Sequence, residues 1–191
     1  YKSEYTVSLG YGSAVALTAA TLLRQATTPV PTLALLHGAA LVFYGLRLNA
    51  FLILRNVLSQ RIQEFNTKVE ERALARGNRW TTRTPFILSC GLLYYGLAVP
   101  LWFHTQLSTT AILPPLTRLV LQTLIAAQWL GFGIAALGDA TKFHVKQSQK
   151  NERYLVTSGI FAWWRHPNYS GELIGWTANA ILGLVTATLW M

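Results

Sequence analysis

Five long apolar stretches constrain this 191-residue chain more than any other feature of its sequence. They cover residues 7–23, 31–54, 85–103, 116–137 and 171–191. Each is close to the roughly 20 residues that a helix needs to cross the hydrocarbon core of a bilayer. Charged residues make up only 12% of the chain, about half of their share in an ordinary soluble domain. The sequence therefore predicts an all-α fold, a polytopic membrane helix bundle with about five transmembrane helices.

The length of the chain leaves room for one bundle, so we predict a single transmembrane helical domain over residues 1–191. The one cysteine, Cys90, excludes an internal disulfide and a cysteine-based metal site. The four histidines show no metal-ligand spacing, so no metal site is predicted; they are His37, His104, His144 and His166.

Positive charge is concentrated in two connections, residues 55–84 and 138–169. If all five stretches cross the membrane, both connections lie on one side. The positive-inside rule then places them and the N-terminus on the cytoplasmic, stromal or matrix side of an endoplasmic reticulum or organellar membrane. Contact with anionic lipid headgroups also explains this charge. Because no soluble domain carries it, we do not expect nucleic-acid binding.

A polar octapeptide, RHPNYSGE at residues 165–172, immediately precedes the last apolar stretch. Polar groups at the mouth of a membrane helix cost free energy, so we expect them to have a function. Pro167 disfavours a helical conformation at His166, which predicts a short turn before the helix begins. The amino end of a helix presents free N–H groups that suit a phosphate or a carboxylate, and Arg165 can add a planar bidentate donor.

Three further side chains of the octapeptide can contact a ligand. Asn168 and Tyr169 can bond to a ribose or an amide, and Glu172 can pair with an arginine or a cofactor hydroxyl. A structural explanation is also open. In it, Arg165 extends to the membrane surface, Asn168 caps the helix, and Tyr169 belongs to an interfacial belt with the neighbouring tryptophans.

Basic residues recur at helical spacing just before this turn. Lys142, Lys146 and Lys150 are four residues apart, Arg153 follows, and Asp139 lies one turn before Lys142. On a helix that continues from the fourth stretch they would form one stripe. The stripe is either a solvated face near the lipid or a phosphate-binding wall opposite Arg165.

The second stretch contains charge at membrane depth. Arg47 and Arg55 are eight residues apart and share a helix face, and Tyr44 precedes Arg47 by three residues. A tyrosine beside an arginine can donate a proton, because the cation stabilises the phenolate. The alternative is a buried structural arginine bonded to carbonyl groups.

These segments resemble a known family. Residues 138–176, with GDATKF at 138–143, TSGIF at 157–161 and the octapeptide, look like the C-terminal part of the steroid 5-alpha-reductase superfamily. They are most similar to the branch known as the domain of unknown function 1295, and residues 44–55 resemble that branch too. The family is a bundle of membrane helices whose reductases use NADPH to reduce a carbon–carbon double bond in a lipid.

The resemblance implies that Tyr44 donates the catalytic proton. It also implies that a second group of residues binds the NADPH cofactor: Arg47, Arg55, Asp139, Lys142, Arg165, His166, Asn168, Tyr169 and Glu172. Two features depart from the family. The first stretch lacks the acidic residue that steroid-type reductases use on an early helix, and the family usually continues beyond the position of Met191.

Two alternatives stay open. Isoprenylcysteine carboxyl methyltransferases and related phospholipid methyltransferases share an Arg-His-Pro-x-Tyr motif and bind S-adenosylmethionine with it. Asn168 and Glu172 favour the reductase branch over these enzymes. The chain could also be a non-catalytic structural subunit of a larger membrane complex. The partners expected are therefore a membrane lipid substrate, the lipid bilayer and, in the last case, other subunits.

Overall fold

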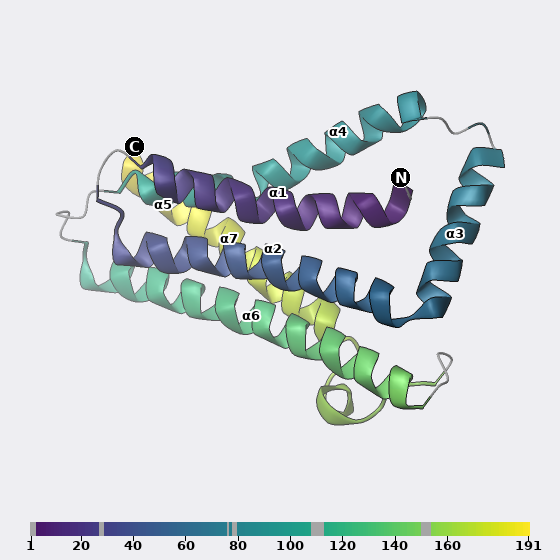
Figure 1. Cartoon of the computed structure of the whole chain (residues 1–191). Helices are drawn as coiled ribbons and strands as arrows, with labels where there is room; N and C mark the ends of the chain where they lie inside the picture. Colours follow the sequence, from purple (N-terminus) through teal and green to yellow (C-terminus); the bar gives the residue numbers. More distant parts are fainter. Residues whose placement is uncertain (1–2, 27–28, 76, 78–79, 108–112, 150–153) are drawn as a thin grey trace. The chain divides into compact units, whose positions relative to one another are not determined.

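The computed structural model describes residues 3–26, 29–75, 77, 80–107, 113–149 and 154–191, with the backbone alone for residues 3–8, 73 and 80–83. Within these ranges the chain is helical and contains no strand (Figure 1). The elements in chain order are α1 (Ser3–Gln25), α2 (Thr32–Leu58), α3 (Gln60–Ala75), α4 (Trp80–Gly96), α5 (Val99–Thr105), α6 (Pro115–Ser148), the 3-10 turn η1 (Gly159–Ala162) and α7 (Pro167–Trp190). The predicted all-α class is confirmed.

Four segments in the described part of the chain are long and apolar enough to cross a membrane. They are Thr32–Leu58, Thr84–Thr105, Pro115–Ser148 and Pro167–Trp190. Each corresponds to one of the stretches expected from the sequence. The remaining stretch, residues 7–23, lies within the 23-residue helix α1, which is not one of these four. The helices confirm an integral membrane protein that resides in a lipid bilayer.

The chain forms two compact units, of which the first comprises Tyr1–Thr21 and Leu41–Ala98. In this unit α1 packs on the carboxyl-terminal part of α2, where the Asn49 amide hydrogen-bonds the Ser13 hydroxyl at 2.7 Å. Tyr11 of α1 stacks on Tyr94 of α4 with 4.3 Å between ring centroids. The bond to Ser13 gives a partner to Asn49, which interrupts the second apolar stretch.

The second unit comprises Leu22–Ala40 and Val99–Met191. Within it, α5 and α6 both pack against α7. Leu121, Ile125 and Leu182 form a buried cluster between α6 and α7. The Trp129 indole N–H donates to the Leu36 carbonyl at 3.1 Å and so joins α6 to the first turns of α2. The single bundle domain expected over residues 1–191 stays a prediction.

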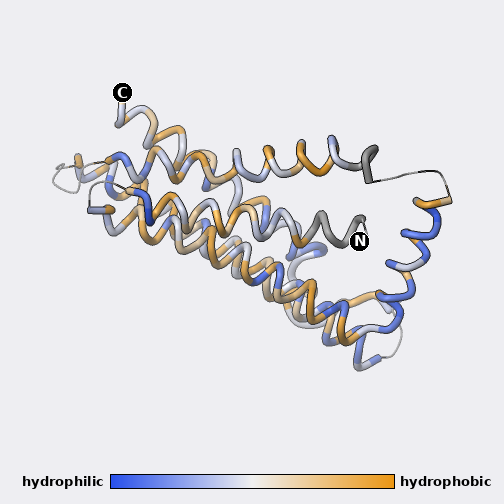
Figure 2. The backbone as a smooth tube through the Cα atoms, turned by 45° about the horizontal axis from the view of Figure 1, so that its top comes forward, coloured by the Kyte–Doolittle hydropathy of each residue, from blue (hydrophilic) through white to orange (hydrophobic). Residues whose placement is uncertain are grey.

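Helix α3 lies in the long basic connection, where the sequence analysis expected no membrane span. Figure 2 shows this helix as hydrophilic along most of its length. Its start is held to the end of α2, because Gln63 Nε2 donates to the Asn56 carbonyl at 2.8 Å. Part of the basic connection is therefore an ordered polar helix.

Candidate functional site

Helices α6 and α7 pack in antiparallel directions through glycines that allow their backbones to approach closely. A Cβ atom added at Gly131 would lie 2.5 Å from the Gly175 nitrogen, and one added at Gly171 would lie 2.5 Å from the Ala135 nitrogen. These neighbours are backbone atoms, which cannot swing aside as a flexible side chain can. Small residues at such positions are typical of packed membrane helices. The contact brings the amino end of α7 against the carboxyl-terminal half of α6.

A side-chain hydrogen bond ties the first turn of α7 to α6. Asn168 Nδ2 donates to Asp139 Oδ1 at 3.2 Å, and both residues are half-buried. A Cβ atom at the adjacent Gly138 would lie 2.7 Å from the Asn168 nitrogen, so the backbones also meet here. Two residues that were predicted to bind a cofactor are therefore in direct contact. The N-cap of α7 is His166, so the alternative in which Asn168 caps the helix is wrong.

The turn before α7 carries exposed polar side chains. Its backbone at His166 is non-helical, with φ −138° and ψ 66°, as Pro167 predicts. The His166 side chain makes no capping hydrogen bond, and the first helical bond runs from the Ser170 N–H to the His166 carbonyl at 2.9 Å. Arg165, His166 and Tyr169 are all exposed. An exposed arginine thus lies beside the first turn of α7, where the helix dipole is positive, while Pro167 in that turn is buried.

The remaining charges of this segment come from both helices. Lys142 is exposed on α6 one turn beyond Asp139, and Lys146 is half-buried one turn further on. Helix α6 extends to Ser148, which confirms that the fourth apolar stretch continues into the basic stripe. Glu172, on α7, is half-buried. The other two members of the predicted stripe, Lys150 and Arg153, lie outside the described residues. We call residues 138–146 and 165–172 together the polar mouth of the α6–α7 pair.

Tyr44, Arg47 and Arg55 belong to the first compact unit. Tyr44 is buried, and the Arg47 guanidinium lies over its ring with 4.9 Å between the guanidinium carbon and the ring centroid. Arg55 lies over Phe51 at 5.6 Å, and its buried Nε has no hydrogen-bond partner in the described part of the chain. The expected proximity of Tyr44 to Arg47 is confirmed. Their roles in catalysis and cofactor binding stay predictions.

One polar cluster was missed by the sequence analysis. It consists of His37, His104, Gln128 and Asn179, which are at most 1% exposed and come from α2, α5, α6 and α7. His37 and His104 had been considered only for metal-ligand spacing, but they are 67 residues apart in sequence and adjacent in space. The sequence did contain a feature that could have predicted this cluster. Each of its members is a polar residue within or at the end of an apolar stretch, and a polar residue at membrane depth indicates a function.

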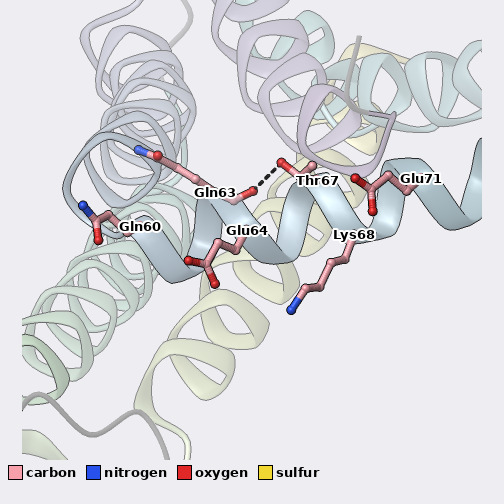
Figure 3. A pocket seen from close by; sticks show the side chains of 6 residues that line it. All are labelled: Gln60, Gln63, Glu64, Thr67, Lys68 and Glu71. Atoms are coloured by element: carbon pink, nitrogen blue, oxygen red, sulfur yellow. Dashed lines mark hydrogen bonds between the residues drawn. The ribbon is translucent and has the colours of Figure 1, made fainter.

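A shallow hollow also follows the surface of α3 (Figure 3). Its lining comes from this single helix and comprises Gln60, Gln63, Glu64, Thr67, Lys68 and Glu71. The Thr67 hydroxyl donates to the Gln63 carbonyl at 2.9 Å, so that side chain is already bonded. A hollow lined by one helix does not enclose a ligand, and we assign it no chemistry.

Comparison with known proteins places these features in a family. Residues 3–191 match the family model described as "Protein of unknown function (DUF1295)", which confirms the resemblance expected from the sequence. The chain is 33% identical over 93 residues to the Protein-S-isoprenylcysteine O-methyltransferase of Xenopus laevis, an alignment that covers 45% of this chain and 32% of that protein. It is 32% identical over 120 residues to the enzyme of that name from Rattus norvegicus, covering 55% and 42% of the two chains.

A shorter alignment leads to a third relative of the same name. It is 45% identical over 56 residues to the protein from Mus musculus and covers 25% of this chain and 19% of that protein. The chain thus spans less than half the length of each of these relatives. No solved structure gives a significant match.

Proposed function

This chain belongs to the DUF1295 family, and from that premise we propose that it is a membrane methyltransferase that uses S-adenosylmethionine. We propose a lipid-linked carboxylate, such as that of a prenylated cysteine, as the methyl acceptor. The observation that carries the proposal is the likeness to the isoprenylcysteine methyltransferases of three vertebrates. The NADPH-dependent reduction that the sequence analysis favoured has no such support from a relative.

The charges of the polar mouth fit S-adenosylmethionine. This cofactor carries a carboxylate, an ammonium and a sulfonium, and therefore has a net positive charge. Asp139, held by Asn168, and the half-buried Glu172 provide negative charge for its cationic groups. The exposed Arg165, beside the amino end of α7, suits its carboxylate. The same mouth also contains Arg165, Lys142 and Lys146, which are cations that the phosphates of NADPH would need, so a binding measurement must decide between the two cofactors.

The proposed methyl transfer depends on the positioning of the two reactants and does not require proton transfer. When bound, S-adenosylmethionine supplies an electrophilic methyl group. A carboxylate acceptor is already ionised at neutral pH, so no base has to remove a proton from it. The exposed Lys142 would attract such an anionic acceptor to the mouth, and the apolar faces of the helices would hold its lipid chain. Orientation of the two reactants then lowers the barrier.

The test is binding of S-adenosylmethionine and of NADPH to the full chain purified in detergent, measured by equilibrium dialysis with radiolabelled ligands. We expect saturable S-adenosylmethionine binding that weakens at least about tenfold in Asp139→Asn and Arg165→Ala, since a hydrogen bond to a charged group is worth about 1.5–3 kcal/mol. Arg118→Ala is the matched control, because Arg118 is an exposed arginine near the other end of α6.

Each ligand gives a distinct result. Binding of NADPH alone, lost in Arg165→Ala, would overturn the proposal in favour of the reductase. If neither ligand binds while all variants keep their helix content, a non-catalytic subunit of a membrane complex becomes the better account. If Arg118→Ala weakens S-adenosylmethionine binding as much as Arg165→Ala does, the arginines act through the net charge of the protein and not through a binding site.

A further inference from the structure

A buried polar cluster lies inside the second unit, away from the polar mouth. Its members are His37, His104, Gln128 and Asn179, all within or at the end of candidate membrane spans. Gln128 lies eleven residues before Asp139 on α6, and Asn179 lies eleven residues after Asn168 on α7. At 1.5 Å per residue, the cluster is ~16 Å along both helices from the bond between Asp139 and Asn168. Polar groups at such depth are costly, and at the bilayer interior they indicate function by default.

Hydrogen bonds join three of the four side chains at Asn179. His37 Nε2 lies 2.8 Å from Asn179 Oδ1, and Gln128 Nε2 donates to the same oxygen at 3.3 Å. With the Asn179 amide in this orientation, His37 Nε2 carries the proton and donates it to Asn179 Oδ1. Its Nδ1 is then an acceptor, and it lies 3.2 Å from the Nδ1 of His104. In this arrangement His104 Nδ1–H donates to His37, and the cluster forms an ordered chain from α5 through α2 to α7.

One polar atom of the cluster lacks a hydrogen-bond partner within the ranges that the structure describes. The buried Gln128 Oε1 has no hydrogen-bond partner among the described residues. Rotating the Gln128 and Asn179 amides together would keep their mutual bond and would leave the Gln128 nitrogen unpaired in place of the oxygen. Either way, one end of this amide lacks a partner. A buried polar group without a partner costs about 1–3 kcal/mol, so its retention in an apolar helix indicates a missing group.

We propose that this cluster binds the hydroxyl group of a lipid that enters from the bilayer. A hydroxyl can donate to Gln128 Oε1, or accept from the amide in its other orientation, and it is neutral. Neutrality is essential, because burying an isolated charge in this apolar surrounding would cost far more than burying a hydrogen-bonded hydroxyl. The four side chains are at most 1% exposed, so a lipid from the hydrocarbon core would have to displace the side chains that cover them. The inference goes beyond the proposed methyltransferase function and does not depend on it.

The test compares two probes of equal heavy-atom count that differ in one hydroxyl group. Binding of tritiated 1-dodecanol and of tritiated tridecane to the full chain in detergent is measured without cofactor. Since a neutral hydrogen bond contributes roughly 1 kcal/mol, we expect the wild type to prefer the alcohol about fivefold. Gln128→Met keeps the side-chain length but removes the amide, and should abolish this preference. Gln106→Met is the matched control, because Gln106 is exposed at the end of α5.

A thermal unfolding measurement distinguishes a loss of lipid binding from a loss of folding in the variant. Gln128→Met removes the unsatisfied oxygen together with the 3.3 Å bond to Asn179, whose oxygen keeps its bond to His37, so the apparent melting temperature should change little. Equal binding of alcohol and alkane by the wild type would overturn the proposal and leave the cluster to a buried water or to helix packing. An alcohol preference that survives in Gln128→Met would place the recognition elsewhere and overturn it as well. Failure of S-adenosylmethionine binding would leave this result unaffected, because the cofactor is absent from the assay.

Discussion

The bond between Asn168 and Asp139 controls the geometry of the polar mouth at the scale of single residues. Asn168→Asp would place a second carboxylate where the amide nitrogen now lies 3.2 Å from Asp139 Oδ1. The variant loses a hydrogen bond to a charged group and gains a like-charge contact. Because both residues are only half-buried, we expect a loss of about 1–2 kcal/mol. A thermal unfolding scan in detergent should show it as a melting temperature lowered by a few degrees.

Exchanging the two residues provides the control. The double variant Asp139→Asn and Asn168→Asp again pairs an amide with a carboxylate, so it should recover most of the lost stability. This is a double-mutant cycle, which isolates the direct interaction from the effect of each single change. A double variant that is less stable than Asn168→Asp alone would mean that each residue acts through other neighbours.

The chemistry of individual residues could be predicted from the sequence, but their pairing could not. The octapeptide was predicted to be functional because charge at a membrane mouth is costly, and that role stays a prediction. The turn at His166 followed from Pro167. The contact between Asn168 and Asp139 joins residues 29 apart and depends on the register of two antiparallel helices. The cluster around Asn179 could not be predicted for the same reason, because its partners His37 and Gln128 are 142 and 51 residues away in sequence.

At the scale of elements, glycine placement on α6 separates packing from helix propensity. A Cβ at Gly131 would meet the α7 backbone at 2.5 Å, whereas one at Gly133 would have nothing within 4 Å. Gly131→Ala should therefore destabilise the α6–α7 pair by about 1–3 kcal/mol through overpacking. Gly133→Ala should be neutral or stabilise α6 by up to about 1 kcal/mol, because alanine has the higher helix propensity. Thermal scans followed by circular dichroism measure both, and equal effects would contradict the packing assigned to Gly131.

Helices could be predicted where the apolar run alone decides the structure. The stretches at 116–137 and 171–191 correspond to α6 and α7 because Pro115 and Pro167 favour helix starts and apolar residues sustain them. The end of α6 was harder to place, because the lysine stripe continues the helix beyond the apolar run to Ser148. Helix α3 has a polar sequence without a membrane-length run, and hydropathy alone does not predict it.

At the scale of the whole molecule, the two basic connections should lie on the same side of the membrane. Between Thr67 on α3 and Ser148 at the end of α6 the chain contains two candidate spans, Thr84–Thr105 and Pro115–Ser148. Two crossings return the chain to the side from which it started. Lysine and arginine in these connections favour retention on the cytoplasmic side or its organellar equivalent. Gln106 and its neighbours, between the two spans, should then lie on the opposite side.

Cysteine labelling tests this arrangement in sealed vesicles of defined orientation. The background variant is Cys90→Ser, since Cys90 is the one native cysteine, and single cysteines replace Thr67, Ser148 or Gln106, which are all exposed. A membrane-impermeant maleimide should label positions 67 and 148 from one side and position 106 from the other. Labelling after detergent permeabilisation shows that each thiol is reactive. If positions 67 and 148 react from opposite sides, one of the two intervening segments does not cross. The polar mouth and the basic connection would then face different compartments, and residues of 55–84 such as Arg55 could not share a cofactor with Arg165.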